Sequence, residues 1–186
     1  MEAYLNAKLM LFDRSRQAVI NRDIDCYKTV RAAVKGSCLT YGINKKADVM
    51  AENIRKAVQD GRIGSEFELI SPWGGGTVFT GMPGVFNVYN ALAAIACAGL
   101  SGASFDAFKS GLYDIYVPGR LQPVPGADTF QGLVDYAHNA ASLEHVLNTL
   151  KDYTDNRLIV VFGCGGDRSR TRRFEMGRVA GEKADL

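Results

Sequence analysis

The densest group of charged side chains in the sequence follows an apolar run near its C-terminal end. In VVFGCGGDRSRTRR, residues 160–173, glycines lead into Asp167 and then into four arginines. Glycines let the backbone approach a ligand closely, and Arg168 can form a two-pronged pair with a carboxylate or a phosphate. The alternative is that the glycines only turn the chain and the arginines are solvated. Residue spacing alone leaves both readings open.

A second polar group lies in VDYAHN, residues 134–139, between a predicted strand and a predicted helix. Ligands of open α/β sheets bind beyond the carboxyl ends of the strands. His138 and the first amides of the helix could therefore face an anion together, and Asp135 could accept from a ribose hydroxyl or support a cation. The simpler alternative, favoured on these residues alone, is that Asp135 turns the strand and His138 caps the helix.

Three further polar residues lie in apolar surroundings. Lys8 stands at the edge of an apolar stripe in EAYLNAKLMLF, where a lysine usually extends its ammonium group into water. Asn87 and Asn90 are spaced i and i+3 at the start of an otherwise apolar helix. Amides beside a buried surface need partners, and a helix cap accounts for at most one of them. An amide is also suited to recognising a base edge or a ribose.

Composition limits the possible functions. A net charge of +2 over 186 residues gives no field that would attract nucleic acid or an anionic membrane. No apolar run approaches the roughly 18 residues that span a bilayer. The four cysteines are widely spaced and only two histidines are present, so we expect reduced thiols in a cytoplasmic protein and no zinc site.

The first part of the sequence alternates strands and helices. Strand 17–23, helix 26–36 and strand 38–43 predict a parallel βαβ unit. The pattern is looser from 49 to 80, with a hairpin around the glycines of residues 66–81. A buried helix is predicted over 84–100, and another over 104–115 with Ser104 as its N-cap.

A proline-rich connector at 116–128 predicts a domain boundary near residue 118. Beyond it, strand 130–137, helix 141–153, strand 157–163 and helix 172–184 have the order of a doubly wound sheet. The predicted fold class is therefore α/β, with one domain over 1–117 and the start of another over 118–186.

The sequence resembles the Mur ligase family along its whole length and in family order. The matching strings are YLNAKLMLF, MPGVFNVYNALAAIA, VPGRLQPV, VDYAHNAASLEHVL and VFGCGGDRSRTRRFEMG. The resemblance implies that residues 1–117 form the latter part of a central ATP-binding domain, built on a parallel sheet with helices. Residues 118–186 would form the first half of a Rossmann-like C-terminal domain that binds an amino acid.

The activity implied by the resemblance is an ATP- and Mg²⁺-dependent amide ligation through an acyl phosphate. The strings are most similar to members that add a diamino acid, meso-diaminopimelate or lysine, to UDP-MurNAc-L-Ala-D-Glu in peptidoglycan precursor synthesis in the cytoplasm. One rival is a folylpolyglutamate- or cyanophycin-type amide ligase. Another is a non-catalytic anion-binding module.

The resemblance also implies roles for particular residues. Lys8 would be carbamylated on its amine and would help hold Mg²⁺, which prefers oxygen ligands. Arg168 would bind the carboxylate of the incoming amino acid. The other positions would contact the nucleotide: Asn87 and Asn90 at adenine, Arg120 from the linker, and Asp135 and His138 at the ribose and phosphates. Lys8 and His138 would be the catalytic residues. We expect the nucleotide-facing side chains to line one cleft between the domains, with Lys8 near its floor.

The sequence also departs from the family pattern. No GKT or GKS phosphate loop and no DNPR-like segment occurs in it. Ser169 stands where Asp is common, Asn139 where Thr is usual and Phe174 where Pro is usual. We therefore expect these 186 residues to show little or no turnover by themselves.

Overall fold

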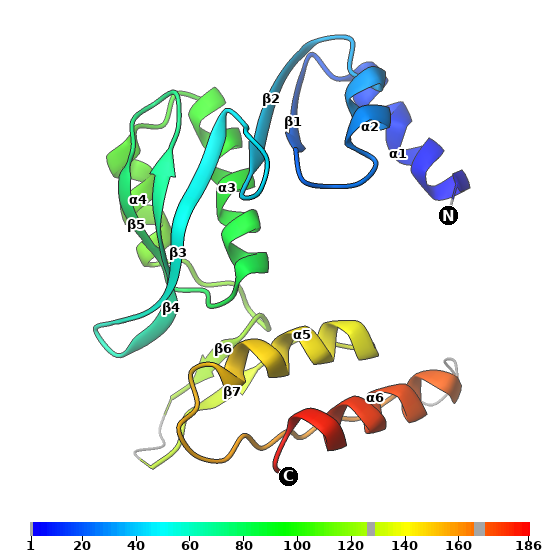
Figure 1. Ribbon diagram of the computed structural model, residues 1–186, viewed down its shortest axis with the longest axis vertical. Coiled ribbons are helices and arrows are strands. Elements are labelled where there is room, and N and C mark those ends of the chain that lie inside the picture. The colour runs from blue at the N-terminus through cyan, green and yellow to red at the C-terminus, as the bar shows by residue number, and fades with distance from the viewer. Residues whose placement is uncertain (1, 126–128, 166–169) are drawn as a thin grey trace. The chain divides into compact units, whose positions relative to one another are not determined.

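The computed structural model describes residues 2–125, 129–165 and 170–186. The chain divides into two compact units, Met1–Ile115 and Tyr116–Leu186 (Figure 1). Each unit has its own apolar core. The α/β fold class is confirmed. None of the described helices is both long enough and apolar enough to cross a membrane.

The first unit begins with helix α1 (Glu2–Arg14) and the predicted βαβ unit. Strands β1 (Gln17–Asn21) and β2 (Ser37–Gly42) pair in parallel, and α2 (Tyr27–Ala33) connects them. Ala18 and Ile20 of β1 pack with Val30 of α2 in a small core, which α1 covers with partly buried apolar side chains. The parallel pairing of β1 and β2 across α2 confirms the predicted βαβ unit.

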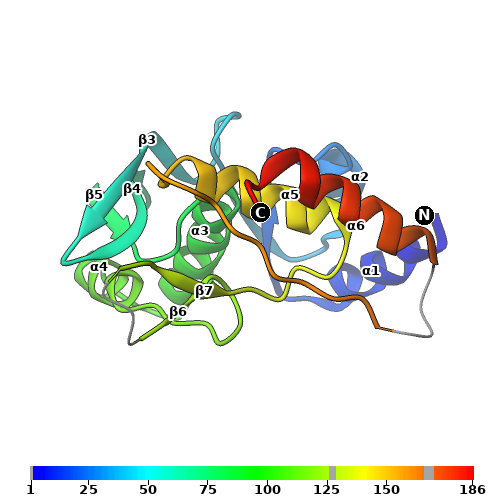
Figure 2. The same cartoon turned by 90° about the horizontal axis from the view of Figure 1, so that it is seen from below.

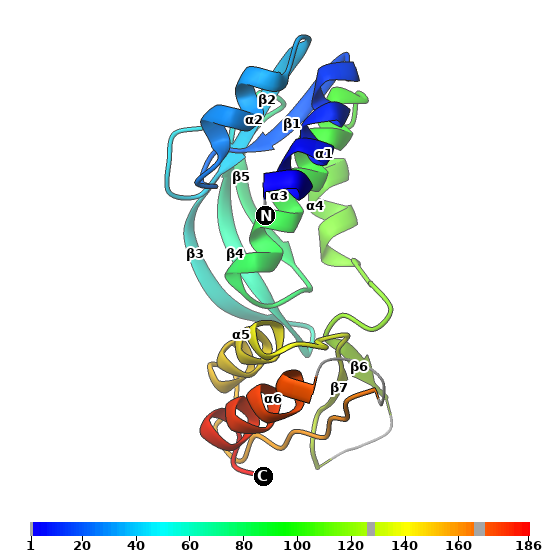
Figure 3. The ribbon, with the colours of Figure 1, turned by 90° about the vertical axis from the view of Figure 1, so that its right-hand side faces the viewer.

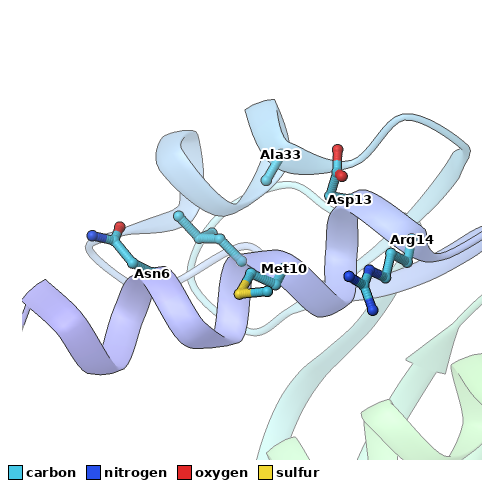
Figure 4. Close-up of a pocket in the computed structure, with 6 residues that line it drawn as sticks. Asn6, Met10, Asp13, Arg14 and Ala33 are labelled. Carbon is cyan, nitrogen blue, oxygen red and sulfur yellow. The ribbon is translucent and has the colours of Figure 1, made fainter.

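Helices α1 and α2 border an open pocket of about 280 Å³ (Figure 4). Its lining residues are Asn6, Leu9, Met10, Asp13, Arg14 and Ala33. An exposed ion pair joins Asp13 to Lys35 at 2.7 Å. Lys8 lies on the same helix but does not line this pocket.

The sheet continues as a mixed sheet in the order β1-β2-β3-β4-β5. Strand β3 (Val49–Gln59) runs parallel to β2, whereas β4 (Arg62–Ile70) and β5 (Gly76–Thr80) add in antiparallel fashion. The sheet is therefore parallel in its first half only, which corrects the expectation of a parallel sheet. The hairpin predicted over 66–81 is confirmed as β4 and β5.

The hairpin between β3 and β4 was missed in the loose pattern of residues 49–80. Gln59 pairs with Arg62, so Asp60 and Gly61 alone form the turn. Both have positive φ, 50° and 75°, as the two-residue turns that match strand twist require. The Asp-Gly pair is the sequence signal that identifies this turn.

Helix α3 (Val85–Leu100) forms the main core with the sheet. Its buried side chains, among them Val88, Leu92 and Ile95, lie in one apolar cluster with Phe67 and Leu69 of β4. Helix α4 (Phe105–Tyr113) lies beside it along the sheet, and Ser104 caps α4 by accepting from Ala107 N, as predicted (Figure 3).

The second unit has a short antiparallel ribbon and two packed helices. Strand β6 (Gln122–Val124) pairs with β7 (Gly132–Val134). Helices α5 (Ala140–Lys151) and α6 (Arg170–Lys183) lie side by side through Leu143, Leu147, Met176 and Val179 (Figure 2). Both predicted helices are confirmed.

The strand predicted at 157–163 is not formed. Val160 N donates to Leu186 O and Asp185 N to Leu158 O, each at 2.8 Å, but the segment enters no regular ladder. Leu158 and Val160 pack on the two helices, whereas Ile159 and Val161 remain exposed. The alternation typical of a strand is present, but among the described residues no strand pairs with this segment.

We expect Gly61→Ala to destabilise the chain by about 1 kcal/mol, because an L side chain at positive φ is strained. A Cβ at residue 61 would meet nothing within 4 Å, so the change in the free energy of unfolding reports backbone strain alone. Gly111→Ala in α4, where the added Cβ is also free of contacts, is the matched control. It should stabilise the chain by up to about 1 kcal/mol in urea unfolding. Equal effects of the two substitutions would contradict the turn assignment.

Candidate functional site

Both oxygens of Asp135 bind backbone amides of the second unit. Oδ2 accepts from Leu121 N at 2.9 Å, and Oδ1 accepts from Ala137 N at 2.8 Å. Leu121 is buried and has a positive φ of 45°, a conformation that is costly for a residue with a branched side chain. Asp135 therefore holds the strained turn after Arg120 against the segment that follows β7. These two hydrogen bonds favour the hypothesis that Asp135 has a structural role at the end of the strand.

Arg120 and His138 meet around one aromatic ring. The guanidinium carbon of Arg120 lies 5.2 Å from the centroid of the Tyr136 ring, within cation–π range. The His138 ring centroid lies 5.1 Å from the same ring, in an edge arrangement. Three predicted site residues, Arg120, Asp135 and His138, are thus brought together within this unit. Tyr136, which joins them, had no role assigned from the sequence.

His138 does not cap α5, so that expectation was wrong. Asn139 is the N-cap: its Oδ1 accepts from Ser142 N at 2.9 Å. An asparagine side chain can bend back onto the first turn from the cap position. His138 is exposed, and its Nδ1 lies 3.1 Å from the carbonyl oxygen of Tyr136.

Asn87 and Asn90 partner one another at the start of α3. Asn87 is buried, its Nδ2 donates to Pro83 O at 2.9 Å, and its Oδ1 accepts from Asn90 Nδ2 at 3.2 Å. Asn90 is exposed. The partners that these amides need are therefore local, and Asn87 orients the amide of Asn90 for contact with solvent or a ligand.

Lys8 is exposed on α1, with its Nζ 5.3 Å from the ring centroid of Tyr4. It belongs with Asn87 and Asn90 to the first unit, whereas the other described nucleotide-site candidates belong to the second. The expected common cleft stays a prediction for that reason. Arg168 lies outside the described residues, as does the adjoining part of the glycine and arginine segment.

A further polar centre, missed by the sequence reasoning, lies at the carboxyl end of β1. Asp23 Oδ2 accepts from Ile43 N at 2.7 Å, Asn44 N at 3.0 Å and the hydroxyl of Tyr89 at 2.9 Å. Asp23 Oδ1 accepts from Lys45 N at 2.8 Å. The carboxylate thus fastens the loop after β2 and the first turns of α3. The signal in the sequence was an acidic residue two positions beyond a buried strand.

The electrostatics of this centre keep its carboxylate charged. Burial raises the pKa of Asp23, but the hydrogen bonds from Asn44, Ile43, Tyr89 and Lys45 outweigh it, so the pKa lies below its ordinary value. Burial, and then the contact with Asp23, raise the pKa of Tyr89 to about 12. The Tyr89 hydroxyl therefore remains a hydrogen-bond donor at neutral pH. In the sequence of α3, Tyr89 lies between Asn87 and Asn90.

Comparison with known proteins places these features in a family. Residues 1–98 match the Mur ligase middle domain, and residues 119–186 match the Mur ligase glutamate ligase domain. The chain belongs to the Mur ligase family. The second match includes the Arg120, Tyr136 and His138 cluster, and the first includes Lys8, Asn87 and Asn90.

Among curated Mur ligases, the chain is 40% identical to the UDP-N-acetylmuramoyl-L-alanyl-D-glutamate–2,6-diaminopimelate ligase of Bacillus velezensis, covering 100% of this chain and 39% of the relative. It is 41% identical to the same-named ligase of Alkaliphilus metalliredigens, covering 100% of this chain and 38% of that relative. The chain thus spans about two fifths of the length of these relatives.

A solved structure of a ligase with this name matches 98% of the chain and 38% of its own length, with a TM-score of 0.71 and 33% identity.

We expect Asp23→Asn to lower the free energy of unfolding at pH 7 by about 2 kcal/mol, since charge-assisted bonds to backbone amides are lost. The pKa of Asp23 is lower in the folded chain than its ordinary 3.8, so the contribution is present above that value. It is lost as the pH falls through the lower, folded-state pKa.

The stability gap between the wild type and Asp23→Asn should therefore be flat near neutral pH and close under strongly acidic conditions. Asp25→Asn, at an exposed carboxylate two residues away, is the matched control and should change stability little. Urea unfolding across the pH range measures both. A gap that widened on acidification would contradict the assignment.

Proposed function

We propose that this chain contributes to an ATP-dependent ligase that joins a diamino acid to UDP-N-acetylmuramoyl-L-alanyl-D-glutamate in the cytoplasm. The observation that carries the proposal is its 40% identity, over its full length, to a relative named for 2,6-diaminopimelate. That name favours diaminopimelate over lysine as the amino acid. In the reaction, a substrate carboxylate accepts the γ-phosphoryl group of ATP, and the amine of the diamino acid then displaces phosphate to form the amide.

The residues present are suited to the nucleotide. Asn90 is exposed and held by Asn87, so its remaining amide hydrogen and its carbonyl oxygen can meet the edge of an adenine. Arg120 and His138 offer a guanidinium and an imidazole on one ring, suited to phosphate or ribose oxygens. We assign Asp135 a supporting part, because its two oxygens already bind backbone amides.

The described residues give less support for the metal. Within the described ranges, no three histidine, cysteine or acidic side chains gather where they could hold a metal ion. Lys8 is exposed, so its amine is accessible for the carbamylation that the family resemblance implies. Bound Mg²⁺ would supply charge neutralisation at the phosphates, and the described residues place no reaction step on it. The proposed role of Arg168 at the amino-acid carboxylate rests on its position in the sequence.

The substrate assignment is tested on a protein of the relatives' length that contains this chain. Diaminopimelate, lysine and glutamate are offered in turn with UDP-MurNAc-L-Ala-D-Glu and ATP, and amide formation is measured. We expect ligation with diaminopimelate by the longer protein, and little or none by the 186-residue chain alone. Exclusive use of glutamate would favour a folylpolyglutamate-type ligase. Tight ligand binding by this chain that magnesium leaves unchanged would favour a binding module.

We predict that Asn90→Ala weakens ATP binding about fivefold or more, because an amide hydrogen bond of about 1 kcal/mol is lost. Cys97→Ala is the matched control, since Cys97 is exposed two turns further along α3. Binding is measured by calorimetry with ATP and with GTP. The substitution should reduce the preference for ATP over GTP. An unchanged preference would contradict adenine contact at Asn90.

A further inference from the structure

Tyr136 touches two side chains proposed to meet the nucleotide, although it has no assigned role itself. Its ring contacts the guanidinium of Arg120 at 5.2 Å and the ring of His138 at 5.1 Å. The residue is 64% exposed, so its ring is not explained as part of an apolar core. All three residues belong to one unit, and their arrangement is therefore internal to it.

The backbone around Arg120 is already fixed. Arg120 N donates to Val117 O at 3.1 Å, and the next amide, Leu121 N, donates to Asp135. Asp135 is the residue directly before Tyr136, so one carboxylate sets the distance between the Arg120 backbone and the aromatic ring. The backbone leaves the long side chain of Arg120 free to move, and ordering such a side chain costs conformational entropy.

The imidazole of His138 is held in a related way. The Nδ1 atom of His138 lies 3.1 Å from the carbonyl oxygen of Tyr136, which can only accept a hydrogen bond. This leaves Nε2 as the atom available to a ligand. The position of the His138 ring is thus constrained by the backbone carbonyl of Tyr136 and by the Tyr136 ring.

We propose that Tyr136 is a positioning residue, whose ring holds the Arg120 guanidinium and the His138 imidazole in place before a ligand arrives. The identity of the ligand rests on the proposed function, whereas the positioning does not. Side chains ordered in advance lose less entropy on binding, which strengthens binding without any new contact. The proposal places this role on the ring, because both contacts, from Arg120 and from His138, are made to the ring.

The first experiment needs no ligand. Side-chain resonances of Arg120 and His138 are recorded by NMR for the wild type, Tyr136→Leu and Tyr136→Phe. We expect Tyr136→Leu to remove the ring-current shifts of both residues and to increase the motion of the Arg120 side chain, and Tyr136→Phe to preserve both properties. Phe174→Leu, which removes another exposed ring of this unit, is the control. Arg120 signals that do not respond to Tyr136→Leu would overturn the proposal.

The second experiment measures ATP binding to the same variants. Tyr136→Leu should weaken it about five- to tenfold, and Tyr136→Phe should leave it unchanged. If the ring acts through Arg120, the effect of Tyr136→Leu should shrink in an Arg120→Ala background, which a double-mutant cycle detects. A purely structural role would instead give additive losses.

The outcomes separate the two proposals. A wild-type chain that binds no ATP counts against the nucleotide site in this chain, while the NMR result still decides whether Tyr136 positions Arg120. Where the wild type binds ATP, an equal affinity of Tyr136→Leu would overturn the role of this positioning in nucleotide binding. Full additivity in the cycle would also overturn it.

Discussion

Backbone amides at the ends of strands must find acceptors, and in both units an aspartate satisfies this constraint. Asp23 follows β1 and receives the amides of the loop after β2, together with the hydroxyl of Tyr89 on α3. Asp135 follows β7 and receives Leu121 N across the unit. Each carboxylate ties a loop to a strand end. The tie at Asp23 holds α3, which carries Asn87 and Asn90, and the tie at Asp135 holds the turn after Arg120.

This use of carboxylates determines which groups remain for a ligand. Both oxygens of Asp135 already have backbone partners, so among the predicted site residues that the structure describes in the second unit, Arg120 and His138 are the ones that present a functional group to a ligand. In the first unit, the side-chain amide of Asn87 already bonds Pro83 O and Asn90 Nδ2, so it orients Asn90. In each unit a polar residue with local partners thus supports a residue that faces solvent: Asn87 supports Asn90, and Asp135 supports the turn that carries Arg120. Such support reduces the entropy lost when a ligand is bound.

Much of the fold could be predicted from local patterns. The parallel βαβ unit and helices α3 to α6 were predicted correctly, because burial periodicity and caps such as Ser104 are local signals. The strand expected at 157–163 failed because a strand requires a neighbour, which its own residues do not specify. The β3–β4 hairpin was not predicted, although the pair Asp60 and Gly61 is a sequence signal for its two-residue turn.

The sequence by itself determined the family, through strings that occur in order along the chain, and the residue types available for nucleotide chemistry. It could not determine which of those residues are structural. Only the tertiary structure showed that Asp135 fastens Leu121, that Asn139 rather than His138 caps α5, and that Tyr136 joins Arg120 to His138. The physical reason is that Arg120 and Tyr136 meet through a turn and a strand pairing, and such contacts leave no periodic trace in the residues between them.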